Sequence, residues 1–114
     1  MLTVLTNLSG ASEDFPPDKT GFMWGLIYGM AKVECGTLPD DLEADYSKSI
    51  RLLSEASSTF APTYQEGLIS GQRKPDPKVR PPVSAETLEA RCNQDQHNLR
   101  MAVMVARGWF RDVW

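Results

Sequence analysis

The clearest pattern in the chain is a repeat of apolar and charged positions between residues 40 and 57. Its apolar members are spaced by four, four and three residues, and they are Leu42, Tyr46, Ile50 and Leu53. This spacing places them on one face of a helix, while charged residues take the remaining face. The start is acidic, with Asp40 and Asp41 directly after Pro39, and negative side chains favour the positive end of a helix dipole. The pattern predicts an amphipathic helix over residues 40–57.

A row of glycines distinguishes a second helix, which we expect over residues 20–35. Thr20 can cap its start, and Gly36 follows in the position where glycine commonly ends a helix. Three glycines four residues apart share one of its faces: Gly21, Gly25 and Gly29. Because an interior glycine costs about 1 kcal/mol relative to alanine, we expect a neighbouring backbone to approach closely along this face. A later segment, which could supply that backbone, has two small residues of its own, Gly67 and Gly71. The alternative to close packing is that the glycine face forms a groove for self-association or for a ligand.

Two further helices follow in the predicted order. The first is short, over residues 61–70, and its buried face is expected to hold Phe60, Tyr64, Leu68 and Ile69. The second is long, over residues 84–112, with Ser84 as a strong N-cap. Asp95 and Gln96 interrupt its apolar stripe near the middle. The stripe consists of Leu88, Cys92, Leu99, Val103, Ala106, Phe110 and Val113.

The segments outside these helices are rich in residues that break regular structure. Residues 1–19 contain paired prolines and several small polar residues, and are expected to form an extended N-terminal arm. Residues 72–83 carry four of the eight prolines and are expected to form a linker before the last long helix. The fold prediction is therefore all-α, a small four-helix bundle that makes a single helical domain of residues 20–114.

Composition narrows the class of protein. With 114 residues, 41% of them hydrophobic and 24% charged, the chain fits one globular domain and not a disordered segment. The net charge of −3 is unevenly spread, because residues 1–59 hold nine acids and four bases whereas residues 60–114 hold six acids and eight bases. Neither half is basic enough to suggest binding to nucleic acid.

The apolar stretches are too short for a membrane span. The best run extends from Gly21 to Ala31, well below the roughly 20 residues that a bilayer requires, although peripheral contact with a membrane stays possible. The first ten residues lack the positively charged region of a signal peptide and are soon followed by Glu13 and Asp14. An already processed chain would look the same, so this region does not settle the compartment.

Residues for catalysis or metal binding are sparse. The two cysteines, Cys35 and Cys92, fit either one disulfide or two buried thiols. The single histidine, His97, is five residues from Cys92, and on one helix the two point in directions about 140° apart. No motif of a metalloprotease, a nucleotide-binding loop or a serine hydrolase is present. We therefore expect no enzyme activity, no metal and no cofactor.

The C-terminal stretch is the best candidate for a partner-binding surface. It is rich in methionine, aromatic and arginine residues, which are enriched at the cores of protein interfaces. The candidate residues are Met101, Met104, Arg107, Trp109, Phe110 and Trp114. The alternative is that this stretch is simply the last core helix.

Residues 21–92 resemble a loose group of small periplasmic helical proteins of alphaproteobacteria. In that group a helix with a G-x-x-x-G-like run ends in cysteine, an acidic helix and an aromatic, glycine-containing helix follow, and a second cysteine closes a disulfide. The matching stretches here are GLIYGMAKVEC, DDLEADYSKSIRLL and FAPTYQEGLISG, followed by Cys92. The chain is more distantly similar to the Rap1a/Tai type of immunity protein, which binds and neutralises a secreted toxin.

These resemblances imply a Cys35–Cys92 disulfide and a periplasmic or secreted location, with a cytoplasmic one left open. Neither resemblance assigns an activity. Together with the candidate surface of the C-terminal stretch, they lead us to expect a non-enzymatic protein that binds a protein partner in the periplasm or cell envelope, as an inhibitor or immunity protein does. The alternative is a structural accessory subunit of a larger envelope or membrane complex.

Overall fold

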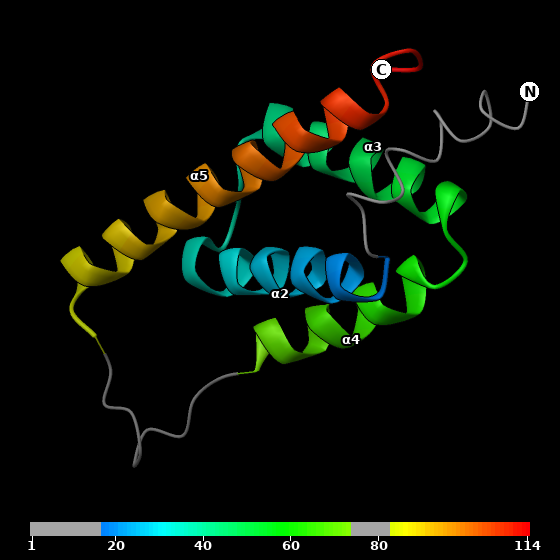
Figure 1. The fold of residues 1–114 in the computed structure, drawn as a ribbon. Helices are drawn as coiled ribbons and strands as arrows, with labels where there is room; N and C mark the ends of the chain where they lie inside the picture. The colour runs from blue at the N-terminus through cyan, green and yellow to red at the C-terminus, as the bar shows by residue number, and fades with distance from the viewer. Residues whose placement is uncertain (1–16, 74–82) are drawn as a thin grey trace, which may run out of the picture.

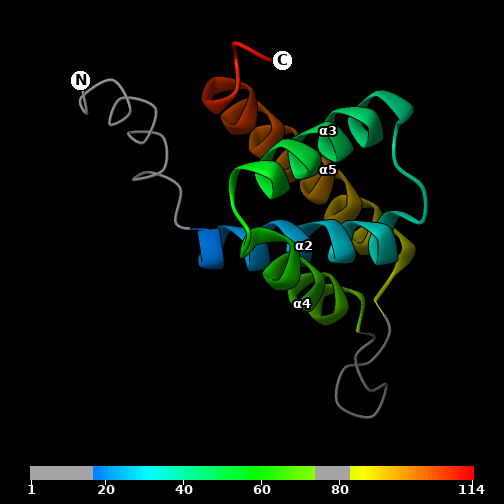
Figure 2. The ribbon, with the colours of Figure 1, turned by 90° about the vertical axis from the view of Figure 1, so that its right-hand side faces the viewer.

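The structure is a computed structural model, and it describes residues 17–73 and 83–114. Within these ranges the chain forms four helices and no strand, which confirms the all-α prediction (Figure 1). The helices are α2 (Pro17–Cys35), α3 (Asp40–Ala56), α4 (Phe60–Gln72) and α5 (Ala85–Trp109). Helix α2 lies in the centre, with α4 on one side and with α3 and α5 on the other (Figure 2).

The backbones of α2 and α4 lie in direct contact along a row of glycines. A Cβ atom added to Gly25 would lie 2.6 Å from the backbone nitrogen of Leu68 and closer still to the carbonyl oxygen of Tyr64. One added to Gly29 would lie 2.7 Å from the Leu68 carbonyl oxygen. From the other side, Gly67 meets the backbone of α2 at Phe22 in the same way. The glycines therefore allow a separation that side chains on either helix would prevent.

Aromatic rings fill the space on the opposite side of α2, toward α3. The ring of Tyr46 lies 5.0 Å from that of Trp24 and is stacked at 5.3 Å on that of Tyr28, measured between centroids. The buried Tyr46 hydroxyl donates a 2.6 Å hydrogen bond to the Trp24 carbonyl oxygen. Phe60, also buried, meets Trp24 edge-on at 6.5 Å. This aromatic cluster, together with Leu42 and Leu53, forms the centre of the hydrophobic core.

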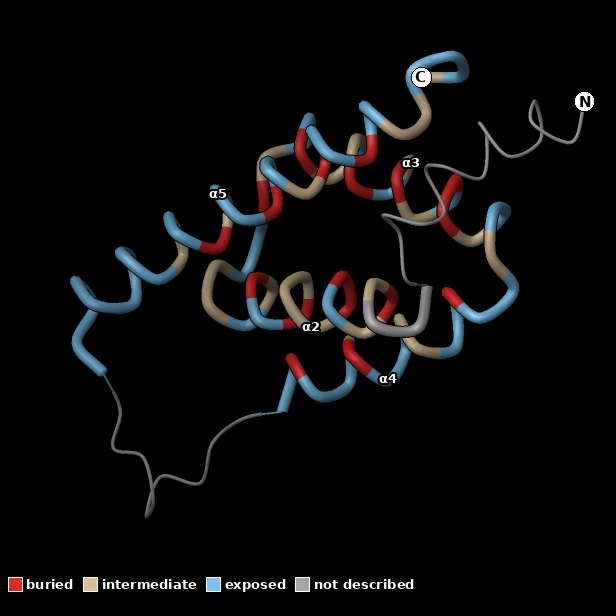
Figure 3. The backbone as a smooth tube through the Cα atoms, in the orientation of Figure 1, coloured by how far each residue is buried: buried red, intermediate tan, exposed pale blue. Residues whose placement is uncertain are grey.

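Helix α5 crosses the same side of α2 and closes the core with one of its faces. Its buried residues are Asp95, Leu99, Val103 and Ala106, at the helical spacing of four, four and three. Most of the helix is exposed on its outer side, and its first two turns extend beyond the bundle (Figure 3). A disulfide between Cys35 and Cys92 ties α5 to the end of α2.

Two helix ends lie where the capping residues in the sequence predict them. Gly36 adopts a positive φ of 79° directly after α2, and its N–H donates to the Lys32 carbonyl at 3.0 Å. The Ser84 hydroxyl accepts a 3.1 Å hydrogen bond from the Thr87 N–H at the start of α5.

Three predicted boundaries were displaced by more than one residue, at the start of α2 and at the ends of α4 and α5. Helix α2 begins at Pro17 and not at Thr20, so residues 17–19 are not part of an arm; proline tolerates the first helical position because the N–H it lacks would have no helical partner there. Helix α4 continues through Gly71 to Gln72, which the prediction had placed in the linker. Residues 1–16 and 74–82, the rest of the predicted arm and linker, lie outside the described residues.

Helix α5 ends at Trp109 and does not continue to Asp112. Beyond it the chain turns back, with the N–H groups of Val113 and Trp114 both donating to the Phe110 carbonyl, at 3.0 and 2.9 Å. The turn directs the last residues toward α3.

Candidate binding surface

Helix α5 has a second apolar stripe, opposite the one that closes the core. Met101, Met104 and Val105 are 46%, 62% and 47% exposed. Their spacing of three and four residues puts them next to one another on the outer face. We call these three residues the α5 patch. Its two methionines are among the residues predicted to bind a partner, but Val105 is not, although it follows Met101 by one helical turn.

Arginines border one side of the α5 patch. Arg100 and Arg107 stand four residues before and three residues after Met104, so all three lie along one edge of the helix. Arg100 pairs with Asp41 of α3 at 3.4 Å, and both side chains are about half exposed or more. The guanidinium of Arg107 lies 5.4 Å from the centre of the Trp114 ring. The patch is therefore apolar with a basic edge.

The C-terminal aromatic residues point the other way. Trp109, Phe110 and Trp114 are half-buried and pack against the hydrophobic core. Trp114 also contacts Lys48, whose ammonium lies 4.9 Å from the ring centre and donates a 2.5 Å hydrogen bond to the Trp114 carbonyl. Of the six residues predicted to bind a partner, the structure thus groups Met101, Met104 and Arg107 outside. It places the three aromatic residues where the alternative, a last core helix, would have them.

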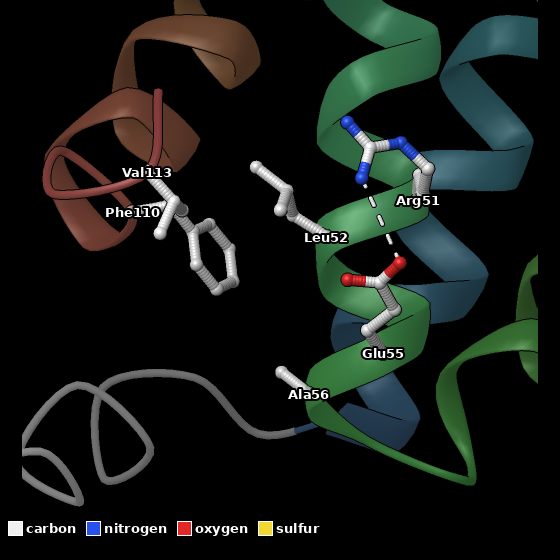
Figure 4. Close-up of a pocket in the computed structure, with 6 residues that line it drawn as sticks. All are labelled: Arg51, Leu52, Glu55, Ala56, Phe110 and Val113. Carbon is white, nitrogen blue, oxygen red and sulfur yellow. Dashed lines mark ion pairs between the residues drawn. The ribbon is translucent and has the colours of Figure 1, made fainter.

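A shallow groove separates the end of α3 from the turn that follows α5. It has a volume of about 440 Å³ and is open to solvent (Figure 4). Leu52 and Phe110 point toward each other across it, while Arg51 and Glu55 form a 3.6 Å ion pair along α3. The remaining lining residues are Ala56 and Val113. The groove holds no nucleophile with an adjacent base, and its apolar floor suits contact better than chemistry.

The two cysteines are joined to each other and supply no free thiol. Their Cα atoms lie 5.0 Å apart, and the bond closes a loop between positions 57 residues apart. This confirms the disulfide over the alternative of two separate thiols. A crosslink of this loop length stabilises a fold by roughly 4 kcal/mol in the chain-entropy account.

Residues for metal binding or acid–base catalysis do not come together in the described part of the chain. No group of three histidine, cysteine or carboxylate side chains is placed there to hold a metal ion. His97 is exposed on α5, away from the buried stripe. One ionisable site was not predicted from the sequence: Asp95, which interrupts the apolar stripe of α5, is buried beside Glu34 of α2.

No helix among the described residues has both the length and the apolar character to cross a bilayer. Comparison with family models, with curated proteins and with solved structures found no match. The resemblance to periplasmic one-disulfide proteins and to immunity proteins therefore stays a prediction.

Proposed function

We propose that this chain is a non-enzymatic protein that binds a protein partner in the periplasm or cell envelope, through the α5 patch. The observation that carries the proposal is the second apolar stripe of α5, formed by Met101, Met104 and Val105 on the side that faces away from the core. Contiguous exposed apolar residues on a small protein commonly mark an interaction site. Methionine suits such a site because its flexible side chain adapts to the shape of a partner.

The basic edge of the patch indicates the chemistry of the partner. Arg100 and Arg107 flank Met104, so a matching surface would present apolar side chains beside an acidic group. A membrane surface fits less well, because helices that lie on membranes usually insert tryptophan or phenylalanine. Here Trp109 and Phe110 pack against the core.

The disulfide supports the proposed location. Disulfides persist in oxidising compartments such as the periplasm and are rare in the cytosol. The Cys35–Cys92 bond holds α5, the proposed binding element, to the end of α2. An inhibitor or immunity protein benefits from such a rigid surface because less conformational entropy is lost on binding.

The test begins with capture of the partner from native extract under non-reducing conditions, followed by binding measurements with the purified partner. Met104→Glu places a negative charge in the patch, and we expect it to weaken binding by about tenfold or more without changing the melting temperature. Ile69→Glu is the matched control. Ile69 of α4 was expected on the buried face of its helix, but it is 61% exposed, and Met104 is 62% exposed.

The control variant should bind like the unmodified protein. Equal affinities for all three proteins would contradict the proposed surface. A third outcome is that the protein binds anionic vesicles but no captured protein, and that Met104→Glu abolishes the vesicle binding. The α5 patch would then be a membrane-binding surface, and the proposal of a protein partner would be wrong.

A further inference from the structure

The buried carboxyl group of Asp95 lies where α5 leaves the core. Residues 85–91 are all exposed, Cys92 is half-buried, and Asp95 is the first buried residue of the helix. Cys92 stands three residues before Asp95, about one helical turn, and its disulfide to Cys35 ties this part of α5 to the end of α2. Asp95 is therefore part of the junction that attaches the exposed start of α5 to the bundle.

The environment of Asp95 does not suit a carboxylate. The residue is only 8% exposed, and among the described residues its Oδ2 atom is buried without a hydrogen-bond partner. Its neighbour across the junction is Glu34 of α2, whose side chain is 17% exposed. Two ionised carboxylates can only accept hydrogen bonds, so they cannot satisfy each other. A single proton on Asp95 supplies the donor that the carboxyl pair lacks.

The charged groups around the pair do not remove the need for this proton. Arg91 of α5 lies 3.8 Å from Glu34, but its side chain is half exposed and so is screened by solvent. Gln96 donates to the sulfur of Cys92, at 3.5 Å. Burial first, and then the hydrogen bond to Glu34 and its charge, raise the pKa of Asp95 to about 7, against the opposing effect of Arg91.

We propose that Asp95 and Glu34 form a proton-binding site that makes the junction of α2 and α5 sensitive to pH. While the proton is bound, the carboxyl pair is hydrogen-bonded and holds the two helices together. When the proton leaves, two negative charges face each other in a buried site, and this turn of α5 is held to α2 by the disulfide and the solvent-screened Arg91–Glu34 ion pair. The start of α5 then opens locally while the core around Leu99 stays closed. This inference is independent of the proposed binding function.

Two measurements on the intact protein test the site. In a carbon-detected NMR titration, we expect the side-chain carboxyl of Asp95 to titrate near neutral pH, well above the ordinary value of about 3.9. In hydrogen exchange corrected for intrinsic rates, we expect protection of the backbone amides of residues 92–98 to fall about tenfold between roughly pH 5.5 and 8.5. Amides of residues 103–109 serve as the internal reference and should change little.

Variants separate the proton-binding site from general effects of pH. Asp95→Asn keeps the shape of the side chain without the titration, so protection of residues 92–98 should become independent of pH. Glu34→Gln should lower the pKa of Asp95 toward its ordinary value. Asp112→Asn removes an exposed carboxyl and should behave like the unmodified protein. An ordinary pKa for Asp95, or an unchanged pH response in both junction variants, would overturn the proposal.

Discussion

Gly25 lies so close to α4 that a single methyl group has no room there. The Cβ of an alanine would overlap the backbone of Tyr64 and Leu68, and backbone cannot rotate away as a side chain can. We therefore expect Gly25→Ala to lower the free energy of unfolding by about 1–3 kcal/mol, as overpacking of a close contact does. Urea denaturation followed by circular dichroism measures the change.

Gly108 on α5 supplies the matched control for this substitution. It is also helical, but a Cβ added there meets nothing within 4 Å. Gly108→Ala should raise the free energy of unfolding by about 0.5–1 kcal/mol, because alanine is the better helix former. If both substitutions stabilised the protein, the close contact of α2 and α4 would be contradicted.

The Tyr46 hydroxyl is a second single group that contributes to the stability of the fold. It is buried, and it donates a 2.6 Å hydrogen bond to the Trp24 carbonyl, linking α3 to α2. Tyr46→Phe keeps the stacked ring and removes only this bond. We expect a loss of about 1 kcal/mol in the free energy of unfolding, from the same denaturation measurement. No loss would mean that the bond contributes nothing beyond what water offers in the unfolded chain.

At the scale of helices, the sequence predicted the elements better than their ends. Periodicity and caps identified four helices, and the glycine stop at Gly36 and the Ser84 cap lie where local chemistry puts them. The end of α4 could not be predicted from neighbours alone. Gly71 continues that helix because its backbone packs against α2, with an added Cβ only 3.0 Å from the Met30 nitrogen. That contact depends on a distant segment.

In the candidate surface too, some residue positions follow from the pattern of one helix and others depend on contacts with distant segments. Met101 and Met104 lie on the outer face because the opposite face of α5 closes the core, and helical spacing alone indicates this. The inward position of Trp114 depends on a turn after α5 and on Lys48 of α3. Asp95 interrupts a predicted apolar stripe, but its partner Glu34 belongs to another helix. Pattern along one helix could not identify that pair.

The disulfide belongs to the scale of elements because it joins two of them. Replacing both cysteines, as Cys35→Ser with Cys92→Ser, should lower the free energy of unfolding by roughly 4 kcal/mol. The reason is that the unfolded chain regains the freedom of a long loop. Denaturation of the unmodified protein with and without reductant gives the comparison. Equal stability in all three samples would show that helix packing alone fixes the position of α5.

Across the whole molecule, the uneven charge of the sequence corresponds to contacts between its two halves. Acids of the first half meet bases of the second where α5 crosses the bundle, as Glu34 with Arg91 and Asp41 with Arg100. The arginine side chains are about half exposed in both pairs, so each contributes little to stability and is weakened by salt. The pairs therefore favour this orientation of α5 over others but add little to the free energy of unfolding.

Two carboxyl groups should make the stability of the whole molecule greatest at mildly acidic pH. Burial alone would raise the pKa of Glu43, but hydrogen bonds from Tyr28 and Lys32, at 2.7 and 3.0 Å, and the Lys32 charge outweigh burial and lower it. A lowered pKa contributes stability that is present above the unfolded value and is lost as the pH falls through the folded value. The raised pKa of Asp95 has the opposite effect: its contribution is complete below the unfolded pKa of about 3.9 and is lost as the pH rises from there to about 7.

The free energy of unfolding should therefore pass through a maximum at roughly pH 4–4.5, where the contribution of Glu43 is nearly complete and that of Asp95 has only begun to be lost. The two sides of this curve have separate causes, and two variants distinguish them. Glu43→Gln should flatten the acidic side, because the group whose protonation costs stability is gone, and leave the other side unchanged. Asp95→Asn should raise stability near pH 8 to the level of the maximum. Urea denaturation at a series of pH values from about 3 to 8 measures both sides of the curve. A variant that altered the wrong side would contradict the assignment of that carboxyl group.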